Sequence, residues 1–408
     1  MIEYKQIDSW LMEQGLSAGA YDGGEMLEAF RLEMEAGLTG TSSSLAMLPT
    51  YLSPLAEGVE GTVAFVDAGG TNLRTGLAGV DARGQVKLDH VVKRAMPGRD
   101  EEVSAEDFYE AICTGLLPVA ERFDRIGFCF SYPAEISPNR DGRLLRWTKE
   151  IQIPEMVGTY VGADLVAALE QRGAGRKSVT VLNDTTATLL AGCSVGRAFG
   201  AEQFVGFILG TGTNCACLYG GQIINMESGN FAAWPCSAVD DRFDSLQPNR
   251  GQYRFEKAVS GAYLGPLTLV AMQQAAQESL FSEKGAAKIE QWRELDTVSL
   301  SMRLAGEAES LCGLAEKDER VMLRIFEALV DRASFFSAVN IAAAMVFDRT
   351  ASAAPICVNT DGSTFYRTPR LAAQTNAYLR SLLMPYDCAF EMKQVVDSPA
   401  VGAAMAAF

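Results

Sequence analysis

The stretch Asp67-Ala68-Gly69-Gly70-Thr71-Asn72-Leu73-Arg74 decides how this chain is expected to fold. Residues 62–66 before it favour a β-strand, and residues 73–80 after it have no helical period, so a strand, a tight turn and a second strand are predicted. A Walker loop or a dinucleotide-binding loop opens a helix after its glycines, which excludes both here. Glycines let the backbone approach a ligand closely, and successive N–H groups with the Thr71 hydroxyl can point at anionic oxygens. We interpret the turn as a phosphate-gripping loop in which Asp67 faces the metal that accompanies the phosphates, with an ordinary tight hairpin as the alternative.

The same arrangement recurs further along the chain. Residues 204–209 are predicted to form a strand that leads into the turn Gly210-Thr211-Gly212-Thr213, and residues 214–219 to form the returning strand. A third candidate hairpin runs from residues 356–359 through the turn Thr360-Asp361-Gly362-Ser363 to residues 364–366. Two hairpins with glycine and threonine at their tips indicate two phosphate-binding loops, so one triphosphate could be held between two halves of the protein.

Size and charge fit such a protein. With 408 residues, of which 48% are hydrophobic, the chain can bury two cores with a cleft between them. The formal net charge of −16 argues against a nucleic-acid groove and against an anionic membrane surface, because either partner requires a concentrated basic field. A bound polyphosphate must therefore be neutralised locally, by backbone N–H groups, a few basic side chains and a divalent ion.

The cysteine and histidine content excludes several kinds of site. Nine cysteines without any CxxC pair indicate reduced thiols in a cytoplasmic protein, and Cys215 and Cys217 are interpreted as buried core thiols. His90 is the only histidine, which excludes a zinc site built on several imidazoles. Residues 1–15 lack the pattern of a secretory signal, and the apolar stretch 335–347 is too short to cross a bilayer, so we expect a buried helix there and no membrane partner.

Coarse periodicity places a candidate catalytic base. Helices are predicted within residues 4–37, 101–120 and 267–347, and strands at residues 126–130 and 179–182. The strand at 179–182 delivers Asn183 and Asp184 to the start of a helix. A carboxylate at a strand end beside phosphate loops is where phosphoryl transfer needs a group that activates a hydroxyl, so Asp184 is the candidate. The alternative is that Asp184 caps the helix by accepting backbone N–H bonds.

Ordered segments along nearly the whole chain resemble those of the hexokinase family, including its smaller single-unit glucokinases. Besides the Asp67 loop, the segments are residues 34–38 (MEAGL), 47–51 (MLPTY), 130–133 (FSYP), 147–149 (WTK), 183–185 (NDT), 210–212 (GTG), 225–227 (NME) and 255–257 (FEK).

The resemblance implies a two-lobed α/β fold of the actin-like, ribonuclease-H-like kind, with mixed β-sheets flanked by helices and a cleft between the lobes. The small domain would comprise residues 61–182 and 396–408, and the large domain residues 1–60 and 183–395. The implied activity is ATP-dependent phosphorylation of a hexose at its 6-hydroxyl to a hexose 6-phosphate. Glucose is the expected sugar, with fructose and mannose as further candidates. ATP and Mg²⁺ would be required, and we expect a monomer or a homodimer.

The resemblance also assigns roles to individual residues. The sugar hydroxyls would be bound by Ser131, Thr148, Lys149, Asn183, Asp184, Asn214, Glu227 and Glu256; carboxylates and amides suit hydroxyls, which both donate and accept hydrogen bonds. The nucleotide would be held by Asp67, Gly69, Gly70, Thr71, Asn72, Gly210, Thr211, Gly212, Thr213, Asp361, Gly362 and Ser363. Asp184 would accept the proton of the sugar hydroxyl, with Lys149 and Arg74 completing the catalytic set. Asp67 and Asp184 would hold Mg²⁺ through water. For Arg74, a surface ion pair is the alternative.

Three positions depart from the family pattern. Glu150 stands where the family commonly has glycine, Ser228 stands where it usually has tryptophan, and Pro399 removes an N–H donor from an expected glycine-rich turn at residues 397–404. We expect Ser228 to leave a roomier sugar pocket. Two alternative interpretations remain. One is a sugar kinase of the repressor/kinase group, which normally carries a Cys and His zinc cluster that this chain lacks. The other is a non-catalytic sugar sensor with the same fold.

Overall fold

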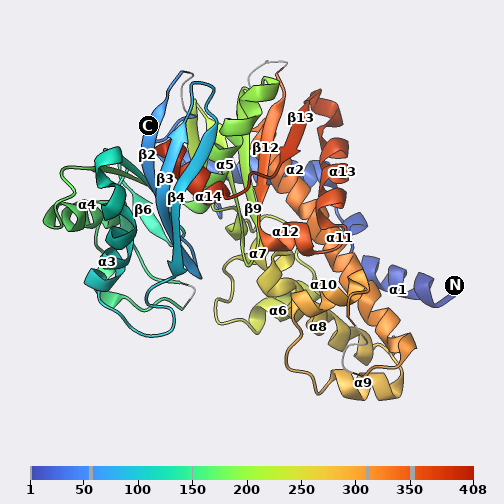
Figure 1. The fold of residues 1–408 in the computed structure, drawn as a ribbon. Helices are drawn as coiled ribbons and strands as arrows, with labels where there is room; N and C mark the ends of the chain where they lie inside the picture. Colours follow the sequence, from blue (N-terminus) through green and yellow to red (C-terminus); the bar gives the residue numbers. More distant parts are fainter. Residues whose placement is uncertain (1, 55–57, 149, 309–312, 350–353) are drawn as a thin grey trace.

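Two β-sheets form the centres of two lobes (Figure 1). The computed structural model describes residues 2–54, 58–148, 150–308, 313–349 and 354–408. The five-stranded sheet has the order β4 (Val86–Ala95), β3 (Asn72–Val80), β2 (Gly61–Ala68), β5 (Arg125–Phe130) and β8 (Ser178–Leu182). The six-stranded sheet has the order β1 (Leu48–Pro49), β11 (Gln222–Asn225), β10 (Thr213–Tyr219), β9 (Gln203–Leu209), β12 (Ile356–Asp361) and β13 (Phe390–Lys393). A small hairpin of β6 (Ala134–Ile136) and β7 (Gly142–Leu144) lies beside the first sheet.

The two hairpins predicted from the glycine turns are confirmed. Strands β2 and β3 pair antiparallel up to Ala68 and Leu73, and β9 and β10 pair antiparallel up to Leu209 and Thr213. The strand pairs β2–β5, β5–β8, β9–β12 and β12–β13 are parallel, whereas β3–β4, β10–β11 and β1–β11 are antiparallel, so both sheets are mixed, as predicted. Each glycine turn therefore lies at the tip of a hairpin within a mixed sheet.

The third predicted hairpin is wrong. Strand β12 ends at Asp361, and the short helix α12 (Ser363–Arg367) follows instead of a returning strand. Both edges of β12 are already occupied, by β9 on one side and β13 on the other, so a returning strand would have no edge to pair with. Gly362 makes the change of direction with a φ of 111°, and a Cβ at this position would lie 2.2 Å from the Leu209 carbonyl oxygen.

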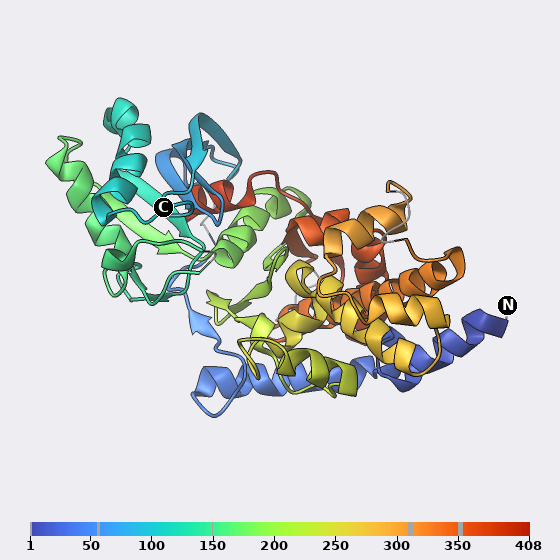
Figure 2. The same cartoon turned by 90° about the horizontal axis from the view of Figure 1, so that it is seen from below.

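Helices cover the sheets and make up most of the second lobe. Figure 2 shows the N-terminal helices (blue) along one side of that lobe. The first lobe contains α3 (Ala105–Leu116), η2 (Leu117–Arg122), η3 (Pro154–Met156) and α4 (Val161–Gln171). The remaining helices are α1 (Ile2–Glu13), η1 (Ala18–Ala20), α2 (Gly23–Thr39), α5 (Asp184–Gly196), η4 (Arg197–Phe199), η5 (Ser228–Asn230), α6 (Ala238–Ser245), α7 (Arg254–Val259), α8 (Gly261–Gln277), α9 (Glu283–Ile289), α10 (Thr297–Ala305), α11 (Glu316–Val346), α13 (Leu371–Leu383), η6 (Met384–Tyr386) and α14 (Ser398–Ala406).

Helix α11 is the core helix that the apolar stretch 335–347 predicts. It is the one helix in the described part of the chain that is long and apolar enough to cross a membrane, and 89% of its most apolar window is buried within the protein. Its neighbours therefore cover its apolar surface.

Helices α5 and α14 lie between the two sheets (Figure 1) and join them through a shared hydrophobic cluster. Glycines make this packing close. A Cβ on Gly127 of β5 would lie 1.7 Å from the Ala403 carbonyl oxygen, and a Cβ on Gly402 would lie 1.9 Å from the Ala187 carbonyl oxygen. A methyl group does not fit at either position. The division into domains at residues 61–182 with 396–408, and 1–60 with 183–395, stays a prediction.

Candidate active site

The first glycine turn leaves backbone donors exposed. Its ends are fixed, because the Gly69 N–H donates to the Asn72 carbonyl at 3.0 Å and the Tyr132 hydroxyl donates to the Gly69 carbonyl at 2.7 Å. The N–H groups of Gly70 and Thr71, between these ends, donate to no described residue. Successive free N–H groups in a tight turn form an anion-binding concavity. The structure thus places Gly69, Gly70, Thr71 and Asn72 together as the predicted loop.

Asp67 and Arg74 face each other across this hairpin. They are paired in the strand register, and Arg74 Nε and Nη2 donate to Asp67 Oδ2 at 2.8 and 2.7 Å. Asp67 is only 6% exposed, so this contact is not a surface ion pair, whereas the side chain of Asp397, the second partner of Arg74, is 45% exposed, as the surface alternative expects. Arg74 Nη1 also donates to the carboxylate of Asp397, just before α14. Arg74 therefore brings one positive charge to a site rich in carboxylates.

The second glycine turn is held against the N-terminus of α8. The Gly210 N–H donates to the Gly212 carbonyl at 2.9 Å, and the Gly210 carbonyl accepts from Gly261 N–H at 2.9 Å and from the Thr364 hydroxyl at 2.8 Å. The carbonyl oxygens of Gly210 and Gly212 thus accept hydrogen bonds from within the protein, whereas the N–H groups of Thr211 and Gly212 donate to no described residue. This second turn has the same donor arrangement as the first.

The turn at Asp361, Gly362 and Ser363 borders the second glycine turn. A Cβ on Gly210 would lie 3.8 Å from Gly362 Cα and 4.0 Å from the Ser363 nitrogen. Burial raises the pKa of the Asp361 carboxyl, the nearby charges of Asp184 and Asp397 raise it further, and Arg74 opposes them. The third turn therefore belongs to the site, although it leads into a helix.

Asp184 does not cap α5. Asn183 is the N-cap residue, because its side chain accepts the Thr185 N–H at 2.8 Å. The half-buried Asp184 carboxylate is left with one long contact, from the Thr185 hydroxyl at 3.4 Å. Its charge raises the pKa of both Asp361 and Glu227, so it lies close to the nucleotide-side turn and to the predicted sugar ligands. Asp184 is thus placed between the two groups of residues.

The predicted sugar ligands Asn214 and Glu227 are joined through Asn225. Asn225 Nδ2 donates to Glu227 Oε1 at 2.8 Å, and Asn214 Nδ2 donates to Asn225 Oδ1 at 2.8 Å. Asn214 Nδ2 also lies 3.4 Å from Glu227 Oε1. Burial raises the pKa of Glu227, the hydrogen bonds from Asn225 and Asn214 lower it, and Asp184 raises it. Asn225, buried at the end of β11, was missed as a site residue, although it lies within a segment that carries the resemblance.

Glu256 connects the sugar side to the second glycine turn. Its Oε2 accepts the Thr213 N–H at 2.9 Å, and a Cβ on Gly212 would lie 2.5 Å from the same oxygen. The carboxylate therefore holds the end of the turn in place. Of the remaining predicted sugar ligands, Ser131 follows β5 and its N–H donates to the Ala68 carbonyl at 3.2 Å, beside the first turn. The Thr148 carbonyl accepts the Ile151 N–H at 3.3 Å, and Lys149 lies outside the described residues.

Arg146 and Tyr253 link the two lobes, and sequence patterns did not identify them. Arg146 Nη2 donates to the Tyr253 hydroxyl at 2.9 Å, although the two residues are 107 positions apart. The Arg146 charge lowers the pKa of Glu227, which places Arg146 near the sugar ligands. The only signal in the sequence was its position directly before the 147–149 segment.

The three departures have structural explanations. Ser228 is 0% exposed and its Oγ accepts from Asn340 Nδ2 of α11 at 2.9 Å, so its side chain is buried against α11, and the expected roomier sugar pocket stays a prediction. Glu150 has a φ of 65°, a conformation that glycine adopts without strain. Residues 398–406 form helix α14 rather than a glycine-rich turn, and Pro399 lies in its first turn, where a missing N–H costs nothing.

The carboxylates of Asp67 and Asp184 suit Mg²⁺ held through water. No group of three or more His, Cys, Asp or Glu side chains is arranged to hold a metal directly in the described part of the chain. Mg²⁺ prefers oxygen ligands, keeps several waters, and is commonly held by one or two carboxylates plus substrate phosphates. The same finding gives no support to a Cys and His zinc cluster of the kind carried by the repressor/kinase group.

Fold and site together define a two-lobed α/β protein with two glycine turns that leave backbone N–H groups without a described partner, and a half-buried carboxylate near both the predicted sugar ligands and the predicted nucleotide turns. Two hexokinase family models match the chain, one over residues 13–194 and the other over residues 204–408. The chain belongs to the hexokinase family.

Similar proteins support this assignment. Hexokinase-1 of Spinacia oleracea is 33% identical over 297 residues, which is 65% of this chain and 59% of that protein. Hexokinase-7 of Oryza sativa subsp. japonica is 31% identical over 323 residues, which is 70% of this chain and 67% of that protein. The chain thus spans about 60% of the length of the spinach relative.

Solved structures confirm the fold. The hexokinase from Schistosoma mansoni complexed with glucose superposes with a TM-score of 0.75 at 23% identity and covers 99% of both chains. A second hexokinase crystal structure gives a TM-score of 0.81 at 23% identity, covering 100% of this chain and 99% of the other. The ROK hexokinase from Thermus thermophilus is less similar, with a TM-score of 0.57 over 85% of this chain.

Proposed function

We propose that this chain transfers the γ-phosphoryl group of ATP to the 6-hydroxyl of a hexose, with glucose as the expected sugar. One observation carries the proposal: Asn183 caps α5, so the neighbouring Asp184 carboxylate is available between the partly buried Glu227 and the Asp361 turn. Membership of the hexokinase family supports the same reaction.

In the proposed mechanism, Asp184 accepts the proton of the sugar 6-hydroxyl. The hydroxyl oxygen forms a bond to the γ-phosphorus, the bond between that phosphorus and the β,γ-bridging oxygen breaks, and ADP leaves with that oxygen. Such transition states are loose, so positioning and charge neutralisation contribute more than base strength. Bound Mg²⁺, held through water by Asp67 and Asp184, would neutralise phosphate charge.

The surrounding residues bind and orient the two substrates. The free N–H groups of Gly70 and Thr71, and those of Thr211 and Gly212, would bind phosphate oxygens from two sides. The Asn214, Asn225 and Glu227 group would bind sugar hydroxyls and disfavour analogues that lack one, because a buried polar group would be left unpaired.

The test measures ADP release with a panel of hexoses for the wild type, Asp184→Asn and the control Asp100→Asn. Asp100 is exposed and is none of the residues assigned above to sugar, nucleotide or metal. We expect sugar-dependent ADP release that falls by roughly 10²- to 10⁴-fold in Asp184→Asn, with unchanged melting temperature, and full activity in the control. Sugar binding without ADP release from the wild type would instead favour the sensor, and wild-type rates in Asp184→Asn would refute the role of Asp184.

We further propose that the protein is cytoplasmic and is a monomer or homodimer. The eight cysteines in the described part of the chain form no disulfide, which supports a reducing compartment. Fractionation and gel filtration test the two points.

A further inference from the structure

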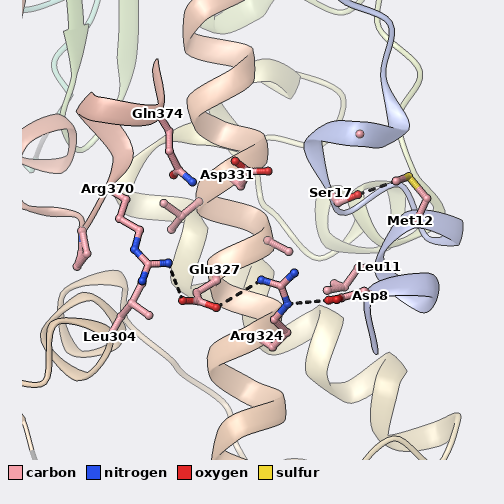
Figure 3. A pocket seen from close by; sticks show the side chains of 14 residues that line it. Asp8, Leu11, Met12, Ser17, Leu304, Arg324, Glu327, Asp331, Arg370 and Gln374 are labelled. Atoms are coloured by element: carbon pink, nitrogen blue, oxygen red, sulfur yellow. Dashed lines mark hydrogen bonds and ion pairs between the residues drawn. The ribbon is translucent and has the colours of Figure 1, made fainter. Parts of the chain in front are cut away.

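A cavity lies apart from the candidate active site, between α1, α11 and the turn that leads into α13 (Figure 3). Its volume is about 430 Å³, within the range of pockets that bind small molecules. None of the residues assigned above to sugar, nucleotide or catalysis lines it. Its wall combines charged side chains with an apolar surface.

A row of four alternating charges crosses the cavity. Arg324 Nε donates to Asp8 Oδ1 at 2.7 Å, Arg324 Nη1 lies 3.5 Å from Glu327 Oε2, and Arg370 Nη1 donates to Glu327 Oε1 at 3.1 Å. Figure 3 shows the Glu327 carboxylate between the two guanidinium groups. Glu327 thus occupies the position between the two guanidinium groups, and a ligand could reach only the outer edges of these arginines.

Several hydrogen-bond donors that line this cavity have no acceptor among the described residues. Arg370 has Glu327 as its only partner in the described part of the chain, so its Nε and Nη2 edge is unoccupied. Its side chain is 67% exposed, and Arg370 is the N-cap residue of α13. The Gln374 side-chain nitrogen also donates to no described residue. The Nε and Nη2 edge of a guanidinium is a planar fork that matches the two oxygens of a carboxylate.

Apolar residues form the wall behind these donors. Leu11 is 1% exposed, Val330 is 2% exposed and Ala328 is 5% exposed, and all three line the cavity. An apolar part of a ligand that covers this wall would be removed from water, which favours binding.

We propose that this cavity binds a small organic acid, with its carboxylate on the free edge of Arg370 and its apolar part against Leu11 and Val330. The net charge of the cavity distinguishes between a carboxylate and a phosphate as ligands. The cavity carries three carboxylates, from Asp8, Glu327 and Asp331, and only two guanidinium groups, so its net charge of −1 disfavours a doubly charged phosphate more than a singly charged carboxylate. The proposal does not depend on the proposed kinase activity.

The test measures binding to the full chain by calorimetry, without sugar or nucleotide. The probes are straight-chain monocarboxylates from butanoate to octanoate, the matched neutral amides and inorganic phosphate. We expect saturable binding of one carboxylate per chain, with affinity rising about fourfold per added methylene group, and no binding of the amides or of phosphate.

Two variants and a control locate the site. Arg370→Gln is expected to weaken octanoate binding at least tenfold and Arg324→Gln several-fold, while Arg83→Ala, an exposed arginine on the turn before β4, leaves binding unchanged. Arg370 is largely exposed, so the variant should keep the wild-type melting temperature, which is measured in parallel. Equal binding by the wild type and Arg370→Gln, binding of amides as tight as that of acids, binding of phosphate alone, or no saturable binding would each overturn the proposal.

Discussion

At the scale of single residues, Glu227 combines features that stability alone does not explain. Its backbone has a φ of 54°, its carboxyl is partly buried with a raised pKa, and a second carboxylate, Asp184, lies nearby. Non-glycine residues in the left-handed region cost about 1–3 kcal/mol when strained, and they cluster at functional sites. The hydrogen bonds from Asn225 and Asn214 reduce but do not remove the unfavourable effect of burial.

Because burial disfavours the ionised carboxylate of Glu227, the variant Glu227→Gln is expected to stabilise the protein at neutral pH. The folded-state pKa lies above the ordinary value of 4.5, so the protonated form is favoured in the folded state. The wild type and the variant should be equally stable below pH 4.5, and the wild type should lose stability relative to the variant as pH rises through the folded-state pKa. Urea unfolding at pH 4 and pH 7 measures this. Exposed Glu101→Gln is the control, and a variant less stable than the wild type at pH 7 would contradict the prediction.

Other residue-level assignments show what sequence patterns can and cannot supply. The glycine turns were predictable because glycine and threonine between β-favouring runs are a local signal. Whether Asn183 or Asp184 caps α5 was not predictable, because both residue types make good caps and only the hydrogen bond to Thr185 decides. The buried position of Ser228 depends on Asn340, more than 100 residues away.

At the scale of elements, the crossing of α5 and α14 fixes how the two sheets are joined. Gly402 of α14 lies against the backbone of Ala187 in α5, and Ala403 lies against Gly127 of β5. The sequence predicted α5 but not α14, because Asp397, Pro399 and Gly402 suggest a turn. The helix forms nevertheless, since Pro399 is tolerated in the first turn and residues 400–406 are almost all buried.

Gly402→Ala is therefore expected to destabilise the protein. The added methyl group would meet the Ala187 carbonyl, a backbone atom that moves only if α5 or α14 shifts, and such overpacking costs about 1–3 kcal/mol or more. Gly79→Ala is the matched control, because a Cβ on Gly79 of β3 would have no atom within 4 Å. Thermal unfolding compares the two variants. Equal melting temperatures would show that the crossing can relax without cost.

At the scale of the whole molecule, the two lobes meet near the site through polar contacts as well as through α5 and α14. Arg146 of the first lobe donates to the Tyr253 hydroxyl of the second lobe across 107 positions of sequence. The two-lobed architecture followed from chain length and family resemblance. Polar contacts between the lobes could not be predicted from the sequence, because they depend on how the lobes are oriented in space.

The hydrogen bond between Arg146 and Tyr253 makes a prediction about closure. The bond joins the segment after β7 to the residue before α7, and its arginine lies near Glu227, so it should favour the arrangement in which the sugar ligands are assembled. Tyr253→Phe removes only the hydroxyl. Since Arg146 is exposed, the loss is expected to be modest: about a threefold to tenfold rise in the KM for hexose, with a nearly unchanged melting temperature. Steady-state kinetics of sugar-dependent ADP release gives the KM, and Tyr386→Phe, at an exposed tyrosine of η6, is the control. A KM equal to that of the wild type would show that the bond does not contribute to sugar binding.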